Sequence, residues 1–457
     1  MFNADLRAQA QDLISAISCQ QQILDSLKAQ LEDVQRQLHS IVYPVLTLPP
    51  EITSEIFVHC LSPSRRLAIV DAKEAPLLLM HVCSAWRGVA VSSPVLWATL
   101  DINATSVAPH FSEIFAVWLQ RAGQCQLSVK IGSSLLEIGD SDFDGFWGTF
   151  RRHSGEMRSL ELNLTRPDFE RMNTHLLAFP LLQNLGIHFA EHDTSLKMFD
   201  HVPMLHELCM NYAPPTILLP WQRLTKFTAK WYTLTECLEA LRLMPNIVEC
   251  HFSSLIEEDS PPASISHPKM QSFTLFDSAT DILDFLTLPA LHTLEILDPT
   301  IFDEDTFDIF LSRSAPLLQS LVMKGDANLR FASLMAVTTL TKLEIWNPPI
   351  LGIGALFGFF ENDTFLPRLR TLSFLGCEEH AQKASVFDLV EMAPQIADIR
   401  GTRPDFQSFR LTADAQRYLA AFSEEQLLLF RKLETEGMHV YIGMENESIV
   451  HMTPKPD

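Results

Sequence analysis

Residues 288–296 read LPALHTLEI, and variants of this nonapeptide recur along the chain. Each copy has an apolar anchor residue, further apolar residues three and five positions later, and usually a proline two positions before the anchor. The clear copies are FPLLQNLGI (179–187), VPMLHELCM (202–210), MPNIVECHF (244–252), HPKMQSFTL (267–275), LPALHTLEI, APLLQSLVM (315–323) and LPRLRTLSF (366–374). Because apolar residues at alternate positions indicate a half-buried strand, each copy predicts one short strand.

The copies recur with the period of a solenoid. Weaker copies are anchored at Met157, Leu224, Leu340 and Ile396, and successive anchors are 19 to 29 residues apart. A repeat of this length indicates stacked supersecondary units. Intervening segments such as LTECLEALRL (234–243) have helical periodicity. The L-x-x-L-x-L pattern resembles leucine-rich repeats, and the resemblance covers residues 155–400.

One position departs from leucine-rich repeats. The asparagine that follows the strand in those repeats is absent, and the matching positions hold Ala190, Ala213, Tyr232, Leu255, Ser278, Pro299 and Asp326. Since that asparagine satisfies backbone groups in regular repeats, its absence predicts an irregular horseshoe. A helix over 415–433 and a strand over 438–442 are expected to cap the solenoid.

The concave side of the predicted sheet is the candidate target-binding surface. Strand alternation turns the second, fourth and sixth residues after each anchor toward this side. An exposed tryptophan beside charged side chains is a plausible anchor for a partner. The expected target-binding residues are Lys226, Lys230, Trp231, Phe276 and Trp346. The alternative is that Trp231 and Trp346 pack against adjacent loops.

Upstream of the repeats, residues 48–100 read LPPEITSEIFVHCLSPSRRLAIVDAKEAPLLLMHVCSAWRGVAVSSPVLWATL. Pro49 and Pro50 suit the first turn of a helix, and Ile52, Ile56 and Phe57 follow on one apolar face. About fifty residues cannot enclose so many large apolar side chains, because small domains have too much surface for their volume. This segment is therefore either a core that packs on the rest of the chain or a docking module with surplus apolar surface.

The order Leu-Pro-x-Glu-Ile, Ile-Phe, Leu, Val-Cys-x-x-Trp-Arg and Pro-x-Leu-Trp resembles an F-box. The charged segment 62–75 is similar to an insertion loop in F-box proteins of mushroom-forming fungi, as is AVWLQRAGQCQLSVKI (116–131) to the segment after the F-box. The resemblance implies a non-catalytic subunit of a Skp–cullin–F-box ubiquitin ligase. It assigns contacts with the Skp adaptor to Leu48, Pro49, Ile52, Ile56, Phe57, Leu61, Val82, Cys83, Trp86, Leu96 and Trp97, some of which must be internal core.

Residues 4–42 lack glycine and proline and have a heptad pattern. Its two seam positions hold Ala10, Ile17, Leu24, Leu31 and Leu38, and Leu6, Leu13, Gln20, Leu27, Val34 and Ile41. Ten of these eleven residues are apolar, which is typical of a coiled coil in which Gln20 fixes the register. The pattern favours a homodimer through residues 4–42. The alternative is a single helix that folds back on the F-box.

The composition of the 457 residues is globular, with 47% hydrophobic and 20% charged residues. The net charge of −22 argues against a nucleic-acid partner. The eight cysteines form no C-x-x-C pair, which disfavours a zinc cage or a compact disulfide framework. The start of the chain lacks a secretory pattern, and the apolar run 350–360 is too short to span a bilayer. We therefore expect no membrane partner and a cytoplasmic or nuclear location, or both.

Motifs for catalysis or metal binding are scarce. The sequence contains no G-x-S-x-G, P-loop or H-E-x-x-H motif. His188 and His192 are four residues apart with Glu191 between them, but their expected position at a strand end disfavours a metal pair. The acidic run 303–308 precedes an apolar helix, where carboxylates complement the helix dipole. We expect no catalytic residue, cofactor or metal.

The sequence thus predicts an α/β architecture of five segments. Residues 1–43 form a coiled-coil helix, 44–101 the F-box, 102–154 a connecting helix–strand segment, 155–400 an irregular leucine-rich-repeat-like solenoid, and 401–457 a capping helix and strand. The resemblance implies a substrate receptor whose F-box binds the Skp adaptor and cullin complex and whose solenoid binds an unidentified protein target. The alternative is a scaffold that binds partners without directing ubiquitination.

Overall fold

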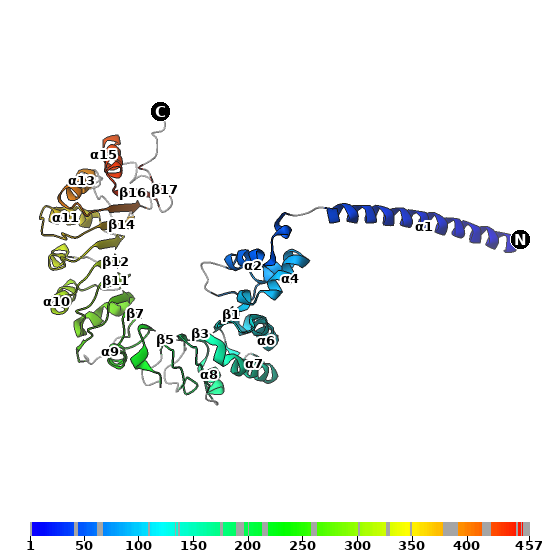
Figure 1. Ribbon diagram of the computed structural model, residues 1–457, viewed down its shortest axis with the longest axis horizontal. Coiled ribbons are helices and arrows are strands. Elements are labelled where there is room, and N and C mark those ends of the chain that lie inside the picture. The colour runs from blue at the N-terminus through cyan, green and yellow to red at the C-terminus, as the bar shows by residue number, and fades with distance from the viewer. Residues whose placement is uncertain are drawn as a thin grey trace. The chain divides into compact units, whose positions relative to one another are not determined.

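The computed structural model describes most of the chain (Figure 1). The described residues are 2–40, 44–61, 67–107, 110–132, 134–135, 138–173, 177–188, 196–199, 201–212, 218–256, 263–299, 302–325, 330–347, 350–377, 392–413, 422–444, 447–448 and 450. The chain divides into two compact units, Met1–Leu96 and Trp97–Asp457.

The first unit is helical. Its elements are α1 (Phe2–Ser40), the 3₁₀ turn η1 (Pro44–Thr47), α2 (Pro50–His59), α3 (Leu77–Val82) and α4 (Ser84–Ser92), and a 3₁₀ turn η2 (Pro94–Trp97) spans the unit boundary. The long helix expected over 4–42 is confirmed as α1, while Ile41 lies outside the described residues. The described seam side chains of α1 from Leu13 to Val34, including Ile17, Leu24, Leu27 and Leu31, are exposed.

The second unit is built on one large, almost entirely parallel sheet. Its strands are β1 (Thr99–Asn103), β2 (Leu127–Gly132), β3 (Met157–Asn163), β4 (Asn184–His188), β5 (Glu207–Asn211), β6 (Lys226–Lys230), β7 (Glu249–Ser253), β9 (Ser272–Phe276), β11 (Thr293–Leu297), β12 (Ser320–Lys324), β13 (Lys342–Trp346), β14 (Thr371–Cys377), β15 (Ser408–Ala413), β16 (His439–Met444) and β17 (Glu447–Ser448). They pair in chain order, and only β17 runs antiparallel to its neighbour. The short strands β8 (Ile265–Ser266) and β10 (Leu286–Thr287) pair separately.

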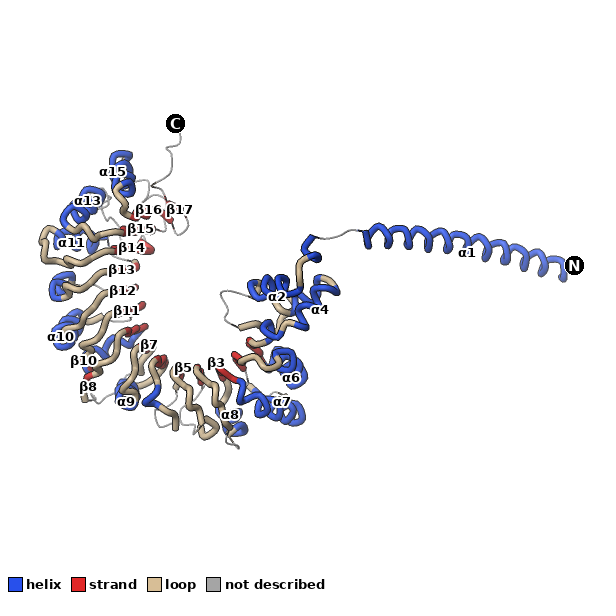
Figure 2. Tube along the Cα trace, in the orientation of Figure 1, coloured by secondary structure: helices blue, strands red, loops and turns tan. Residues whose placement is uncertain are grey.

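Helices of the second unit connect the strands and lie on the outer side of the curved sheet, as Figure 2 shows. The α-helices are α5 (Ala104–Val107), α6 (Phe111–Ala122), α7 (Asp140–His153), α8 (Arg166–Met172), α9 (Leu234–Leu243), α10 (Glu304–Ser314), α11 (Ile350–Phe360), α13 (Met392–Thr402) and α15 (Glu424–Thr435). The 3₁₀ segments are η4 (Ser154–Glu156), η5 (Trp221–Arg223), η6 (Asp277–Phe285) and η7 (Phe331–Ala336). This succession of strand and crossover confirms a mixed α/β, solenoid-like repeat fold.

The anchor residues form the core of the solenoid. The anchors at 182, 205, 224, 247, 270, 291, 318, 340 and 369 are all buried, as the repeat pattern predicts. Each strand adds further inward residues, and aromatic rings meet edge to face from strand to strand, with the Phe227–Phe252 and Phe252–Phe273 centroids 6.1 and 5.8 Å apart. Because each repeat buries its apolar face only against its neighbours, the core is continuous along the sheet.

The repeat extends beyond the segment in which the nonapeptide is recognisable. β1 and β2 pair in the same parallel sheet as β3, and β15 and β16 continue that sheet after residue 400. The anchor assigned to Ile396 was wrong. Ile396 lies inside α13 with Ile399 buried beside it, and the buried residue before β15 is Phe406. Apolar residues three apart fit a helix as well as the repeat, and here the helix forms.

The turns after seven of the described strands, β5, β6, β7, β9, β11, β12 and β13, share a conformation that the sequence did not reveal. The residue directly after the strand has a positive φ angle at Tyr212, Trp231, Ser254, Asp277, Asp298, Gly325 and Asn347. Left-handed backbone costs a non-glycine residue about 1–2 kcal/mol. Backbone hydrogen bonds offset this, since Trp231 N–H donates to Ser253 O at 3.2 Å and Asn347 N–H to Leu375 O at 2.7 Å. We term these residues the corner residues. Their shared backbone conformation makes the turns from β5 to β13 alike, although the asparagine is missing there and the sequence predicts an irregular horseshoe.

Among the helices that the structure describes, none has both the length and the apolar character needed to cross a bilayer.

Candidate functional site

The first unit exposes aliphatic side chains along α2 and the segment before it. Ile52 and Ile56 are 50% and 43% exposed, and because they are four residues apart they lie on one face of the helix. Leu48 and Pro49, which lead into α2, are also exposed. We term Leu48, Pro49, Ile52 and Ile56 the α2 face. Several exposed aliphatic side chains so close together are typical of a binding surface.

The structure divides the predicted adaptor-binding residues into three groups. The exposed residues are Leu48, Pro49, Ile52, Ile56 and Val82. The half-buried residues are Leu61, Cys83 and Trp86. The buried residues are Phe57, Leu96 and Trp97. The last group is buried, as expected for those predicted residues that are internal core, while adaptor contact by the exposed residues stays a prediction. Phe57 and Leu96 belong to the first unit, whereas Trp97 begins the second unit and its ring meets that of Trp118 with centroids 4.8 Å apart.

Contacts on the buried side of α2 fix the orientation of its exposed side. The Phe57 and Trp86 rings meet edge to face with centroids 5.0 Å apart. Ser54 Oγ donates to Ser93 Oγ at 2.8 Å, which ties α2 to the end of α4. Cys83 caps α4, because its Sγ accepts a hydrogen bond from Trp86 N–H at 3.5 Å. The α2 face is therefore held by a packed interior.

Sequence reasoning missed further exposed apolar residues of the first unit. Leu78 lies four residues before the predicted Val82 on α3, and both are exposed. Val45 and Leu46 in η1 are exposed as well. Leu78 follows the same helical spacing as Val82, so that spacing was the signal that could have identified it.

The concave side of the sheet in the second unit carries outward residues in rows. The register pairs Lys230, Ser253, Phe276, Leu297, Lys324 and Trp346 as consecutive residues of one row, the last outward position of each strand. The structure thus places three predicted target-binding residues, Lys230, Phe276 and Trp346, in a single row. Lys226 is on the parallel row at the start of β6, and Trp231 is a corner residue.

Ion pairs between neighbouring strands neutralise much of the charge on the concave side. Lys226 Nζ lies 2.9 Å from Glu249 Oε1, and Lys324 Nζ lies 3.1 Å from Asp298 Oδ2. Each pair is partly exposed and contributes little stability. Lys226 is thereby occupied within the sheet, which weakens its assignment as a target contact.

The Glu161 carboxylate is the most strongly perturbed acid on the concave side. Hydrogen bonding from His188 at 3.3 Å and from Lys130 at 2.7 Å lowers the pKa of Glu161 to about 2. Gly186 makes this possible, because a Cβ there would lie 2.9 Å from Glu161 Cγ. The sequence places His188 four residues before His192, a spacing that faintly suggests a metal pair. In the structure, His188 contacts the Glu161 carboxylate instead. His192 lies outside the described residues.

Trp231 is a half-buried platform at the edge of the concave side. Its ring stacks on Tyr212, the corner residue of the preceding strand, with centroids 4.4 Å apart. Lys230 Nζ lies 4.2 Å from the centroid of the Trp231 ring, within cation–π range. The stacked Tyr212 and Trp231 rings and the Lys230 ammonium group therefore lie side by side, an arrangement that suits a binding surface.

Trp346 and Phe276 retain exposed ring surface in the same row. Trp346 is half-buried, and its Nε1 donates to Glu344 Oε1 at 2.7 Å. Phe276 is 37% exposed at the end of β9. Trp231 and Trp346 are both half-buried, so among the described residues each packs locally and keeps part of its ring exposed.

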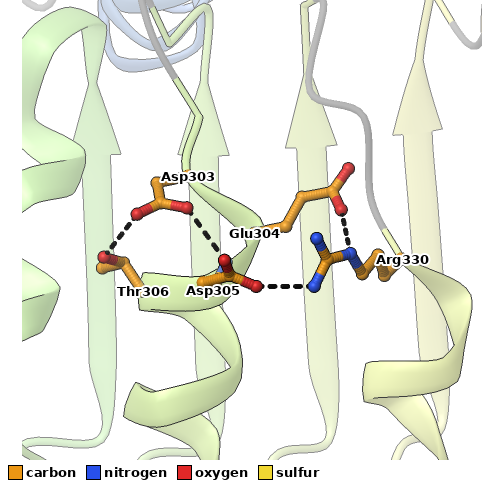
Figure 3. Close-up of polar contacts among 5 residues, drawn as sticks. All are labelled: Asp303, Glu304, Asp305, Thr306 and Arg330. Carbon is orange, nitrogen blue, oxygen red and sulfur yellow. Dashed lines mark hydrogen bonds and ion pairs between the residues drawn. The ribbon is translucent and has the colours of Figure 1, made fainter.

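The acidic run 303–308 caps α10 and forms ion pairs with the following repeat. Figure 3 shows Asp303 accepting hydrogen bonds from Asp305 N–H at 3.0 Å and from Thr306 Oγ1 at 2.9 Å. Arg330, before η7, lies 2.5 Å from Glu304 and 2.6 Å from Asp305. The neighbouring carboxylates raise the pKa of Arg330. The run is thus a helix cap, as predicted, and also an inter-repeat ion pair.

Three thiols of the second unit, those of Cys209, Cys237 and Cys250, are poorly suited to nucleophilic chemistry. Burial raises the pKa of Cys209 to about 11, and burial also raises the pKa values of Cys237 and Cys250. A thiol that stays protonated at neutral pH is a weak nucleophile. In the part of the chain that the structure describes, no group of three or more His, Cys, Asp or Glu residues is arranged to hold a metal ion.

Comparisons with known proteins assign no family. No family model matches the sequence, and no curated protein matches it. Among solved structures, the chain is similar to a chain in the crystal structure of the Rad7 and Elc1 complex in yeast, with 13% identity and a TM-score of 0.29. The alignment covers 92% of this chain and 97% of that chain. Similarity at this level supports no functional argument.

Proposed function

We propose that the chain is an F-box substrate receptor of a Skp–cullin–F-box ubiquitin ligase. The observation that carries the proposal is the exposure of Ile52 and Ile56 on a helix whose other side is packed by Phe57. These are F-box positions that the resemblance assigns to adaptor contact. A helix that presents an aliphatic face from a rigid interior is a common form of docking element.

The concave side of the solenoid is the proposed target-binding surface. Lys230, Phe276 and Trp346 share one row, and Trp231 stands at its edge. Strands in a sheet are about 4.8 Å apart, so this row spans roughly 25 Å from β6 to β13. Partly exposed aromatic residues of this kind supply much of the binding energy at protein interfaces.

The proposed mechanism is templating without covalent chemistry by this chain. The α2 face would hold the Skp adaptor and with it the cullin complex, while the concave side would hold the target near the activated ubiquitin. The gain is effective concentration, which rises when two sites are tethered. The chain is thus proposed to be a non-catalytic subunit that acts in the cytoplasm, the nucleus or both, with no nucleic-acid or membrane partner.

Self-association through α1 is part of the same proposal. Leu13, Ile17, Leu24, Leu27 and Leu31 occupy heptad seam positions and are exposed. A parallel, in-register pair places Gln20 opposite its own copy, where the two amides can hydrogen-bond. In an antiparallel pair centred on α1, Gln20 would face an apolar residue. The parallel homodimer is therefore the arrangement that we propose.

The second candidate is an interaction scaffold that binds partners without directing ubiquitination. Ion pairing of Lys226 and the hydrogen bond of Trp346 weaken the target-binding part of the receptor proposal, since both side chains are engaged within the chain. The two candidates differ in one observable. A receptor co-purifies with the adaptor and cullin and carries ubiquitinated proteins, whereas a scaffold does not.

Affinity purification of the tagged full-length chain from cells tests the proposal. Wild type is expected to recover the Skp adaptor, the cullin and ubiquitin conjugates. The Ile52→Asp, Ile56→Asp variant is expected to lose all three. Ile309→Asp, Leu428→Asp is the matched control, because these residues are also exposed aliphatic side chains on helices, α10 and α15. Recovery of the adaptor without cullin or conjugates would instead establish the scaffold.

A further inference from the structure

Exposed aliphatic side chains gather before strands β4 to β6, at the amino-terminal edge of the sheet. Leu181, Met204 and Leu218 are 40%, 52% and 67% exposed. Leu181 and Met204 precede paired residues of β4 and β5 by three positions, so they are neighbours in successive repeats. We term Leu181, Met204 and Leu218 the edge patch. Exposed apolar side chains that cluster in this way are typical of a binding surface.

Hydrogen-bonded turns fix the backbone of the edge patch. The turns are closed by bonds of 3.2 Å from Leu182 N–H to Phe179 O, from Leu205 N–H to Val202 O and from Leu224 N–H to Trp221 O. Leu181 and Met204 each occupy the third position of such a turn, directly before a buried anchor. Their outward direction therefore follows from the turn that each repeat forms.

A pocket of about 380 Å³ adjoins the edge patch between β5 and β6. Pro203 lines it from the turn before β5, and Leu218, Leu219 and Pro220 line it from the segment before β6. Arg223 also lines the pocket, and its guanidinium donates to Pro203 O, which ties the two segments together. A largely apolar hollow with a few fixed polar groups is the usual form of a ligand-binding site.

Arginine side chains stand at both ends of the edge patch. Arg158 is exposed at the start of β3, where its Nε donates to Gln183 Oε1 at 2.9 Å, and Arg223 is exposed before β6. Among the described residues neither guanidinium is paired with a carboxylate. Glu156, close to Arg158 in sequence, pairs instead with His153 at 2.8 Å. Each guanidinium has five N–H donors, so both keep donors for a ligand.

The separation of the two arginines fits a short extended peptide. Arg158 is at the start of β3 and Arg223 precedes β6, so three strand spacings, about 14 Å, lie between them along the edge. In an extended chain alternate residues point the same way, and four residue steps cover about 13 Å. The middle residue of such a segment lies over β4 and β5, where Leu181 and Met204 are exposed.

We propose that the edge patch binds an extended, acidic peptide segment of a partner protein, with a large apolar side chain on the patch and a carboxylate two residues to either side. Arg158 and Arg223 each bind one carboxylate through charge-assisted hydrogen bonds. The charge pattern of the segment complements an apolar patch between two cations in a protein of net charge −22. The inference goes beyond the proposed function, since it requires neither the α2 face nor the concave side.

Binding of three degenerate peptide libraries to the full-length protein tests the proposal. The first library has Glu-x-Phe-x-Glu at its centre, the second Lys-x-Phe-x-Lys and the third Glu-x-Ser-x-Glu, where x is any residue. Fluorescence polarisation is expected to show that the first library binds about tenfold tighter than either of the others, or about 1.4 kcal/mol. Binding of the first library that is no tighter than that of the second or the third would overturn the proposal.

Two double variants separate the charged contacts from the apolar one. Arg158→Gln, Arg223→Gln is expected to abolish the preference for glutamate over lysine and to keep the preference for phenylalanine over serine. Met204→Gln, Leu218→Gln is expected to do the reverse. Because one preference survives in each variant, its loss of the other cannot be attributed to unfolding.

Matched controls change side chains of the same kind elsewhere in the second unit. Arg368→Gln, Arg370→Gln removes two exposed arginines, and Ile309→Gln, Leu317→Gln removes two aliphatic side chains that are each 54% exposed. Both controls are expected to bind the three libraries as wild type does. Loss of a preference in a control, or survival of both preferences in the edge-patch variants, would contradict the assignment of the site.

Self-association distinguishes a peptide from a second copy of the chain as the occupant. Sedimentation velocity without peptide is expected to give the same species for wild type and for Met204→Gln, Leu218→Gln. A larger species that this change removes would assign the edge patch to a second copy and overturn the peptide proposal.

Discussion

Ile56 and Phe57 are adjacent in α2 and have opposite environments. Ile56 is 43% exposed, whereas Phe57 is fully buried and its ring centroid lies 5.0 Å from that of Trp86. Successive residues of a helix point about 100° apart, so a helix at a surface can hold neighbours in core and solvent. Substitution of Phe57 therefore tests folding, and substitution of Ile56 tests binding.

The first prediction concerns the stability of the first unit. Phe57→Ala is expected to lower the free energy of unfolding by about 3–5 kcal/mol, because it leaves a cavity against Trp86. Ile56→Ala is expected to change it by less than about 0.5 kcal/mol, as is usual for exposed sites. Denaturant titration followed by tryptophan fluorescence measures both. Equal losses would mean that Ile56 is core and that α2 has no free face.

The second prediction concerns acid stability and Glu161. The folded-state pKa of Glu161 is about 2, below its ordinary 4.5, so its stabilisation is present above pH 4.5 and is lost as the pH falls toward 2. Glu161→Gln is expected to lower stability at pH 7 on the order of 1 kcal/mol, since solvent screens this partly exposed group. The loss should shrink as the pH falls below 4.5.

Gly186→Ala probes the same carboxylate without removing it. The added Cβ would lie 2.9 Å from Glu161 Cγ and displace the side chain from His188 and Lys130. The pKa of Glu161, followed by NMR titration, is expected to rise from about 2 toward 4.5. An unchanged titration would show that Glu161 keeps its partners and that Gly186 is not required.

The third prediction compares the effects on stability of alanine substitutions at two glycines of the second unit. Gly376 has φ +64°, and a Cβ there would lie 2.5 Å from Asn347 Oδ1, the side chain of a corner residue. Gly376→Ala is expected to destabilise by about 1–3 kcal/mol. Gly358 lies in α11 with open space around it, so Gly358→Ala is expected to stabilise by roughly 0.5–1 kcal/mol. Thermal unfolding of the two variants should therefore shift in opposite directions.

The fourth prediction concerns self-association. Leu24→Lys, Leu27→Lys places charges in the exposed seam of α1 and is expected to convert a dimer into a monomer in sedimentation velocity. Gln22→Lys, Ala29→Lys is the control, because these positions lie on the outer side of the heptad. A wild-type monomer, or a dimer that survives the seam change, would leave α1 as a helix with another role.

Periodicity predicted the features that repeat. The anchors at 182, 205 and 291, the strands after them and the helix 4–42 follow from local patterns of apolar residues, and local patterns determine which face of an element is buried. Ile396 shows the limit of this reasoning. Spacings of three residues fit a helix and the repeat alike, and only packing against neighbours decides between them.

Features that depend on contacts between repeats could not be predicted. The corner residues are chemically diverse, from Trp231 to Asn347, so their shared backbone conformation leaves no residue signature. Arg368 lines a groove with residues that precede five different strands, β11 to β15, so the groove depends on the register of those strands, which no single repeat encodes. Likewise, nothing in the F-box segment alone distinguishes buried Phe57 from exposed Ile56, since both fit the same apolar face.

The most direct test of the central claim is isothermal titration calorimetry of the purified chain with a purified Skp adaptor. Wild type and the Ile309→Asp, Leu428→Asp control are expected to bind with equal affinity. Ile52→Asp, Ile56→Asp is expected to bind at least about a hundredfold more weakly, or about 2.7 kcal/mol, while it unfolds at the same temperature as wild type. Equal binding of all three folded proteins, or no binding by wild type, would contradict the assignment of the α2 face as the adaptor-binding surface.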